Sequence, residues 1–409
     1  MLLNRARLSR ELEAARLDAV VLATEANVVY GSDFASEFML GRFEDNVVAV
    51  VVPRDPALDP ALIVAEFDLP YLAERPSWIT DVRPYGSPWS SVGAFMGATL
   101  EAKLDTALRE RLLDLRTRVK PLQQPTLVAA VVEALRARGL QKSHIGCDDL
   151  RLACKLAAAG VGREGGIADV LWLMRRVRLV KTPDERAIMT VGARLNAEAL
   201  AAVVKVGRPG IAETDMTRVY RRYLTDHDAR HLGDRGMMFG AGDASSFSLP
   251  MSDQRTLEPG EAIVLDCLGT WRGYYMDLAR TGVVGEPTNA QKHRYQAVLT
   301  ALQAVEATMK AGTNTQDVRA LVRETIGGFG LRRELVSVTT HALGLEVFEF
   351  PYEDSLADGF VLEEGMIVNT EVFYRDPELG SFHLEDSVAV DGGGCALLHP
   401  VPRDLVVFA

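Results

Sequence analysis

The sequence predicts a mixed α/β (α+β) protein with two domains, covering residues 1–166 and 167–409. Three observations support this fold class. The chain has 409 residues, which is long for one hydrophobic core. Short apolar runs alternate with helical patterns in the first part, as in an α/β domain. Four glycines within residues 160–166 then precede a region of longer elements, and we expect the domain boundary there.

The first domain begins with a helical pattern that leads into a strand. Apolar residues between Leu8 and Leu17 recur at roughly helical spacing. The apolar run 18–22 follows as a short buried strand. Four further elements are expected, which are strands at 47–52, 61–65 and 145–147 and an amphipathic helix at 127–138.

The second domain opens with a helix start at residues 181–185. Thr182 can cap the helix, Pro183 fits its first turn, and the two acids that follow suit the positive end of the helix dipole. The helix is expected to run through Val203. The segments 210–215 and 312–317 resemble each other, which fits either a duplicated α/β unit or two similar helix starts.

Composition and charge exclude several classes of partner. The net charge is -11 and the sequence pI about 5.3, so no basic surface for nucleic acid is present. Apolar runs such as 47–52 are strand-length, so no membrane partner is expected, and residues 1–10 do not resemble a signal peptide. The four cysteines form no CxxC pair, which predicts a cytoplasmic location.

Two predicted strands of one hairpin each end in an aspartate. The strand 262–266 ends in Asp266, the strand 273–277 ends in Asp277, and residues 269–273 form the turn. Such a hairpin can place the two carboxylates side by side on neighbouring strands. Like charges in that position are destabilising unless a cation lies between them. The pair therefore favours a metal site.

A second predicted strand pair and a histidine extend this pattern. Strands near 365–371 and 381–388 carry Glu371 and Glu385, and His341 follows a further apolar run. Four carboxylates with one imidazole suit manganese, cobalt, zinc or iron. The five residues together predict two divalent metal ions, whose identity stays open. Such ions can activate water, so hydrolysis of a small molecule is the expected reaction class.

These residues resemble the pita-bread metallohydrolases, the superfamily of methionine aminopeptidase and prolidase. The resemblance is closest to prolidase and aminopeptidase P. It rests on Asp266, on Asp277 followed by Arg280-Thr281, on the single His341, and on the two glutamates, with Gly344, Glu349 and Pro351 in addition. Residues 17–31 are similar to the creatinase-type amino-terminal domain, and residues 180–185 to the usual start of the catalytic domain.

The resemblance implies a creatinase-like domain before a pita-bread catalytic domain, and a metallopeptidase of the Xaa-Pro dipeptidase or aminopeptidase type. It implies that Asp266 and Glu385 bridge the two ions, that Asp277 completes one, and that His341 and Glu371 complete the other. Glu371 would also shuttle a proton between water and the leaving nitrogen. Thr281 would steady a ligand. A homodimer that acts on a small peptide is the corresponding expectation.

The chain departs from the peptidases of this family at several substrate positions. Phe348 replaces a substrate-contacting histidine, and Ser248 and Leu249 lie where another histidine is usual. His383 replaces an arginine, and Val372 replaces a proline.

Phe348 cannot donate a hydrogen bond to an oxyanion, so another donor is needed. His383 is the candidate for that catalytic role, with His227 and His231 as further possibilities. Substrate contacts are expected from Phe348, His231 and Tyr374. The alternatives to a peptidase are a hydrolase or lyase of a small nitrogenous or sulfonium metabolite, and a binding protein without catalysis. The exact substrate stays open.

Overall fold

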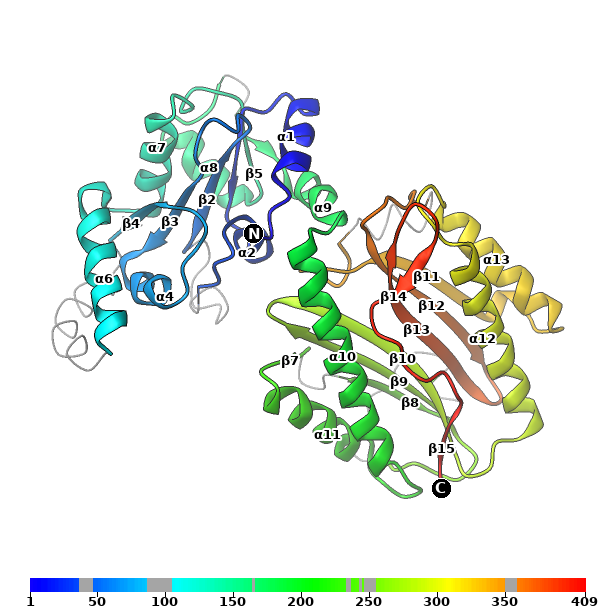
Figure 1. Ribbon diagram of the computed structural model, residues 1–409. Helices are drawn as coiled ribbons and strands as arrows, with labels where there is room; N and C mark the ends of the chain where they lie inside the picture. The colour runs from blue at the N-terminus through cyan, green and yellow to red at the C-terminus, as the bar shows by residue number, and fades with distance from the viewer. Residues whose placement is uncertain are drawn as a thin grey trace. The chain divides into compact units, whose positions relative to one another are not determined.

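The computed structural model describes residues 1–36, 47–86, 105–163, 166–232, 237–242, 245, 255–349 and 359–409, with side chains left undescribed at 237–240. These residues form two units, Met1–Arg178 and Leu179–Ala409 (Figure 1). The division follows Arg178 rather than residue 166. The reason is local, because β6 (Ala168–Asp169) pairs with the sheet of the first unit and Arg178 bonds to Asn27 there.

The first unit is a six-stranded mixed sheet in the order β4-β3-β2-β1-β5-β6. Its strands are β1 (Ala19–Leu22), β2 (Ala49–Pro53), β3 (Ala61–Ala65), β4 (Asp81–Tyr85), β5 (Ile145–Cys147) and β6. Its helices are α1 (Arg5–Ala14), α2 (Glu25–Ser32), α4 (Leu69–Glu74), α6 (Thr106–Val119), α7 (Leu127–Ala137), α8 (Leu150–Ala158) and α9 (Leu171–Leu179), with 3-10 turns at Glu66–Asp68 and Lys120–Leu122. The predicted strands are confirmed. They are buried on both faces, which explains their continuous apolar runs.

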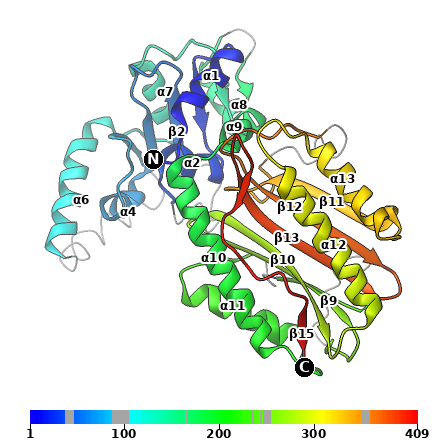
Figure 2. The same ribbon diagram turned by 45° about the vertical axis from the view of Figure 1, so that its right-hand side comes forward.

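The second unit is a larger sheet with the main order β11-β12-β13-β10-β9-β7. Its strands are β7 (Arg230–His231), β8 (Met237–Ala241), β9 (Ala262–Trp271), β10 (Tyr274–Val284), β11 (Val336–Ala342), β12 (Ile367–Asp376), β13 (Gly380–Val390), β14 (Cys395–Leu397) and β15 (Val406–Phe408). Its helices are α10 (Pro183–Val206), α11 (Glu213–Asp226), α12 (Asn289–Thr308) and α13 (Thr315–Gly328), with a 3-10 turn at Arg333–Leu335. Figures 1 and 2 show α10 beside β9 and β10, and α12 beside β12 and β13.

The helix α10 starts as the sequence predicts. Thr182 accepts a hydrogen bond from the backbone of Glu185, and the Glu185 side chain accepts one from the backbone of Thr182, which is a capping box. By length and composition alone, this is the one described helix that could cross a membrane. It packs against β9, β10 and α11, as a core helix does.

The two halves of the second unit repeat one pattern, which supports a duplicated unit. Each half runs helix, helix, and then an antiparallel strand pair. The residue before the second helix forms an isolated antiparallel bridge in both halves, Ala212 with Thr256 and Asn314 with Val361. A matching bridge at matching positions is not explained by two similar helix starts alone.

The hairpin of β9 and β10 turns through only two residues. Arg272 and Gly273 both have positive φ, at 50° and 83°, as tight hairpin turns require. The predicted turn over residues 269–273 is therefore too long. The shorter turn pairs Asp266 with Ala279 and Asp277 with Leu268. The two carboxylates are thus diagonal neighbours on one face rather than directly opposite.

Strand alternation separates a helix-covered face of this sheet from a face that carries the acids. The apolar residues Leu265, Cys267 and Leu278 pack in the core under α10 and α11. Val372 and Leu384 pack in the core under α12 and α13. The acids of the same strands are offset by an odd number of residues, so their side chains point to the other face. The mixed α/β class is confirmed.

Glu185 gives the fold a specific pH dependence. Burial raises the pKa of this carboxyl to about 7, although Lys181 and the hydrogen bonds from Thr182 and Tyr274 lower it. A carboxyl whose pKa is higher folded than unfolded stabilises below its unfolded value of 4.5, and this contribution is lost as the pH rises through about 7. Glu185→Gln keeps the capping box, so the difference in unfolding free energy between wild type and variant should change between about pH 4.5 and 7.

Urea unfolding at several pH values measures this difference. Glu286→Gln is the matched control, because the Glu286 side chain is 84% exposed and should give a flat difference curve. A flat curve for Glu185→Gln as well would contradict the prediction.

Candidate metal centre

Five strands bring four carboxylates and one imidazole to the sheet face opposite α10–α13. Register explains how they meet. Asp266, Ala279, Glu385 and Glu371 form one row across β9, β10, β13 and β12. Glu371 and Glu385 are direct cross-strand partners, a like-charge pairing that destabilises a sheet unless it is compensated. Asp277 lies two residues along β10 from that row, and His341 on β11 pairs with Asn369 of β12.

His341 lies at the centre of this group. Its Nε2 is 3.4 Å from Glu371 Oε1, 3.5 Å from Glu385 Oε1 and 3.9 Å from Asp277 Oδ2. One ligand atom each of Asp277, His341 and Glu385 lies within 4.8 Å of the other two, as around a metal ion. Asp266 shares the row with Glu385 and is 5% exposed. The sequence-predicted ligands are therefore brought together.

The ionisable groups at this site have shifted pKa values. Burial raises the pKa of Asp266 and Asp277 well above the usual range, and the neighbouring carboxylates raise it further. Burial alone would lower the pKa of His341, but Glu371 and Glu385 outweigh it and raise that pKa. The pKa of Glu371 is lowered, because His341 and other nearby cations outweigh its burial. The group holds protons or cations at neutral pH.

Two buried atoms of the group have no hydrogen-bond partner among the described residues. They are Asp277 Oδ1 and His341 Nε2. Leaving buried polar atoms unpaired is costly, and metal coordination would satisfy both. Carboxylate oxygens with one imidazole nitrogen are the donor set of manganese, iron, cobalt or zinc. The residues present fit divalent metal ions.

Neighbouring groups hold the ligands in position. His341 Nδ1 lies 2.8 Å from the carbonyl oxygen of Val347, so Nδ1 carries the proton and Nε2 is free to coordinate. Asn369 Nδ2 donates to Glu385 Oε1 at 2.9 Å, and Ser387 Oγ donates to Asn369 Oδ1. Thr281 bonds to the main chain of His383 rather than to a ligand side chain. Its expected supporting role thus acts through the β13 backbone.

The loop after His341 is fixed by a buried acid. Glu349 is 1% exposed and accepts a hydrogen bond from the backbone of Leu345 at 2.7 Å. A side chain at Gly344 would meet the Glu349 carboxylate and the Lys181 ammonium, and both would have to move. The carbonyl of Gly344 also accepts from the backbone of Tyr275, which ties this loop to the β9–β10 hairpin.

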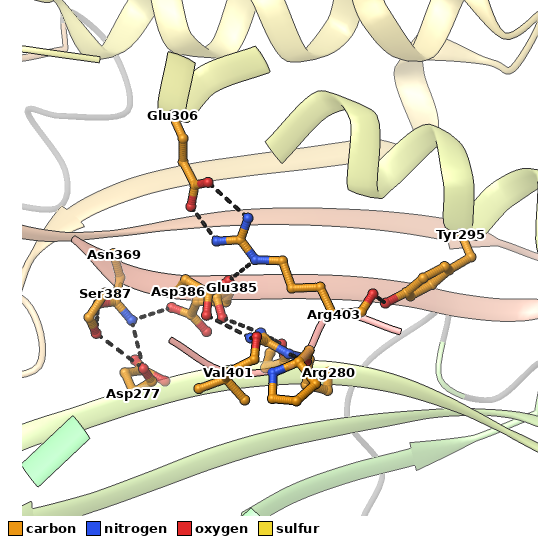
Figure 3. A network of polar contacts seen from close by, with 12 residues as sticks. Asp277, Arg280, Tyr295, Glu306, Asn369, Glu385, Asp386, Ser387, Val401 and Arg403 are labelled. Carbon is orange, nitrogen blue, oxygen red and sulfur yellow. Dashed lines mark hydrogen bonds and ion pairs between the residues drawn. The ribbon is translucent and has the colours of Figure 1, made fainter. Parts of the chain in front are cut away.

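An ion network lies on the helix-covered sheet face, between Glu385 and α12 (Figure 3). Arg280 is 1% exposed and donates to Asp386 Oδ1 at 2.7 Å and to the main-chain oxygen of Glu385 at 2.9 Å. Arg403 donates to Asp386 Oδ2 at 2.8 Å and also pairs with Glu306 of α12. This network joins β10, β13, α12 and the C-terminal segment behind the candidate metal ligands.

Two residues expected at the site lie elsewhere. Tyr374 is three residues from Glu371, so alternation sends it to the helix-covered face, where it packs in the core. This corrects the expectation of a substrate contact. His231 pairs with Gly269, whose α-carbon faces Leu224 of α11, so register directs it away from Asp266. His227 is exposed and stacks on Tyr223.

Two other expected residues do border the acids. The Phe348 ring packs against His341 with centroids 4.6 Å apart and is 36% exposed. His383 Nε2 lies 3.8 Å from Glu371 Oε2, and neither ring nitrogen of His383 has a hydrogen-bond partner among the described residues. Ser248 and Leu249 lie outside the described residues.

Sequence reasoning missed the residues that support the ligands. Asn369 lies two residues before Glu371, and Ser387 lies two after Glu385. The period of two along a strand would have placed both beside the acids. Arg280 and Asp386 gave no comparable signal, because their pairing depends on the contact between β10 and β13.

Removing one ligand should abolish metal uptake. Asp277→Asn keeps the side-chain size but removes one charge, and His341→Ala removes the nitrogen donor. Each should lower the affinity for Mn²⁺ by more than about 100-fold, because even supporting residues of metal sites contribute 10–100-fold. Equilibrium dialysis with elemental analysis measures this. His227→Ala is the matched control and should bind as wild type does. Wild-type metal content in both ligand variants would show that the acids do not bind metal.

Comparison with known proteins agrees with this geometry. A family model described as metallopeptidase family M24 matches residues 187–392, and one described as the creatinase/prolidase N-terminal domain matches residues 5–149. The chain is 24% identical over 283 residues to an uncharacterized peptidase of Bacillus subtilis, covering 69% of this chain and 80% of that protein. It is 26% identical over 234 residues to the Xaa-Pro dipeptidase of Pyrococcus furiosus, covering 57% and 67%.

Solved structures of similar fold cover nearly the whole chain. The Xaa-Pro dipeptidase from Bacillus anthracis has a TM-score of 0.75 at 21% identity and covers 98% of both chains. The X-Pro aminopeptidase from Thermotoga maritima has a TM-score of 0.76 at 18% identity and covers 97% of this chain and 99% of its own. At this identity they show the fold alone. Since the family model matches half of the chain, the protein belongs to metallopeptidase family M24, with a creatinase/prolidase N-terminal domain.

Proposed function

We propose that this chain is a metal-dependent dipeptidase that cleaves the amide bond before proline. The observation that carries the proposal is the buried group of Asp277, His341 and Glu385, with Asp266 and Glu371 in the same row of the sheet. The similarity to proteins named Xaa-Pro dipeptidase supports the choice of substrate. Family membership makes the chain a hydrolase of the M24 peptidases.

The five ligands would hold two divalent ions, with manganese, cobalt, zinc and iron as candidates. When bound, such ions supply a polarised substrate carbonyl and a water of lowered pKa.

Glu371 is suited to move the proton. The hydrogen bond and charge of His341 lower its pKa despite burial, so it is a carboxylate at neutral pH. Its side chain is 23% exposed, against 7% for Asp277 and 2% for Glu385, so a substrate can reach it. It would accept a proton from the attacking water and deliver it to the leaving nitrogen.

His383 would replace the hydrogen-bond donor that Phe348 cannot supply. Burial lowers the pKa of His383, so its ring is neutral and carries one N–H. Its Nε2 lies 3.8 Å from Glu371 Oε2, beside the position of the reacting amide. A buried, unpaired N–H at that point can stabilise negative charge that develops on the carbonyl oxygen.

A second candidate function rests on the aromatic residue Phe348 beside the acids. The Phe348 ring is 36% exposed next to His341. Aromatic faces attract cations, so a small nitrogenous or sulfonium metabolite would also be bound here. On this alternative the chain is a hydrolase or lyase of such a metabolite.

Turnover of a defined substrate panel tests the proposal. The protein loaded with Mn²⁺ should hydrolyse Xaa-Pro dipeptides at least about 100-fold faster, in kcat/KM, than the matching Xaa-Ala dipeptides. Hydrolysis or elimination of a small cationic metabolite without dipeptide turnover would favour the second candidate. Absence of both activities with two bound metal ions would refute both.

Loss of the His383 side chain should lower the rate without loss of metal. His383→Ala should reduce kcat about 100- to 1,000-fold, which is the usual effect of removing one oxyanion donor. Metal content, measured on the same sample, should stay at the wild-type value because His383 is not a ligand. His293→Ala on α12 serves as a control for histidine removal. An unchanged kcat would remove His383 from the mechanism.

A further inference from the structure

A cationic side chain on the site face of β12 has no place in the mechanism described so far. Arg375 follows Glu371 by four residues and therefore points to the same face of the sheet. It is half-buried, and burial lowers its pKa while Glu371 raises it. The Glu371 carboxylate, four residues away, already lies 3.4 Å from His341 Nε2. Arg375 therefore keeps a charge that the described protein does not fully balance.

Two stacked aromatic rings and one hydrogen bond hold this guanidinium in place. The rings of His383 and Phe373 stack with centroids 4.5 Å apart and planes 9° apart. The guanidinium carbon of Arg375 lies 3.9 Å from the centroid of the Phe373 ring. The side chain therefore bends back along the strand towards Glu371. Its Nε also donates to Ser337 Oγ on β11 at 3.3 Å, which limits its rotation.

The outer edge of the guanidinium remains available. Among the described residues, only Nε of Arg375 has a hydrogen-bond partner, and the two terminal nitrogens have none. An arginine side chain presents its donors as a planar fork that matches a carboxylate. Holding such a fork by stacking and one anchoring bond prepares it for an anionic ligand, since little side-chain entropy is lost on binding.

The distance from the acids fixes which carboxylate would fit. Phe373 lies two residues beyond Glu371, so a guanidinium above its ring is roughly 7 Å from the Glu371 position along the strand. One peptide residue spans about 3.5 Å. A carboxylate–guanidinium hydrogen bond adds about 2.8 Å. These sum to about 6 Å, which places the carboxylate one residue beyond the cleaved bond.

We propose that Arg375 is a specificity-determining residue, which binds the free carboxylate one residue after the scissile amide and thereby restricts the enzyme to dipeptides. This inference rests on the proposed function. It assigns a carboxylate site to Arg375 on β12 rather than to the uncharged His383 on β13. The Phe373 ring contacts both the guanidinium and the His383 ring.

Paired substrates that differ only at the carboxylate test this proposal. The Mn²⁺-loaded enzyme is compared on Ala-Pro and on Ala-Pro amide. Wild type should prefer the free acid by about 10- to 100-fold in KM, the usual effect of a charge-assisted hydrogen bond, with similar kcat. Arg375→Met should raise KM for the acid to the value for the amide and leave kcat within about threefold. Arg375→Lys should restore part of the preference, since it keeps the charge but not the fork.

Arg175→Met is the matched control. Arg175 stacks on Trp172 at 4.6 Å in the first unit, so this change removes an equivalent stack elsewhere and should leave both KM values unchanged. If wild type cleaves acid and amide equally well, or if Arg375→Met keeps the preference, the proposal fails although the dipeptidase function stands.

A binding measurement decides the case in which neither substrate is cleaved. That result would reject the proposed function but not the anion site. Calorimetric titration of N-acetyl-L-proline and its amide then gives the answer. If Arg375 is a carboxylate site, the acid should bind at least about tenfold more tightly than the amide. The Arg375→Met variant should lose this difference. Equal binding of both compounds would overturn it.

Discussion

Repulsion between clustered carboxylates is the constraint on which the second unit is built. Glu371 and Glu385 are direct partners on adjacent strands, and Asp266 lies in the same row, separated from Glu385 only by Ala279. A sheet would not keep this arrangement without positive charge, because like charges opposite each other destabilise the pairing. His341 can supply one positive charge, and only when it is protonated. Burial raises the pKa of Asp266 and Asp277, so these carboxyls also need protons or cations as partners.

Side chains on the other face of the sheet hold together the strands that carry these acids. Ala279 with Glu385 is the one register pair that joins β10 to β13, so backbone pairing alone holds these strands weakly in the described part of the chain. Arg280 adds a bond to the main-chain oxygen of Glu385 and an ion pair to Asp386. Buried ion pairs seldom add stability over an apolar core, but they do fix one geometry. Here that geometry sets the spacing between Asp277 and Glu385.

Local patterns in the sequence predicted much of the fold, and pairing between distant segments accounts for what they missed. The capping box at Thr182 and the strands of the first unit depend on neighbouring residues, so they could be predicted. The diagonal offset of Asp266 and Asp277 depends on a turn of two residues. The glycines at 269 and 273 had instead suggested a turn of five residues. Tyr374 was misplaced although alternation from Glu371 predicts its true face. His231 could not be placed, because the pairing of β7 with β9 is not encoded locally.

The same division holds for the site. The five candidate ligands could be named from their order and residue types, since acids within apolar runs are conspicuous. Arg375 and Phe373 could have been found by counting in twos from Glu371. The stack that joins them to His383 requires the register of β12 against β13, which only the structure gives.

Anomalous diffraction from crystals soaked in Mn²⁺ tests the central claim most directly. The account predicts two anomalous peaks per chain, both within coordination distance of the acids and His341. A map without peaks at this position, from protein that is folded and fully exposed to the ion, would contradict it.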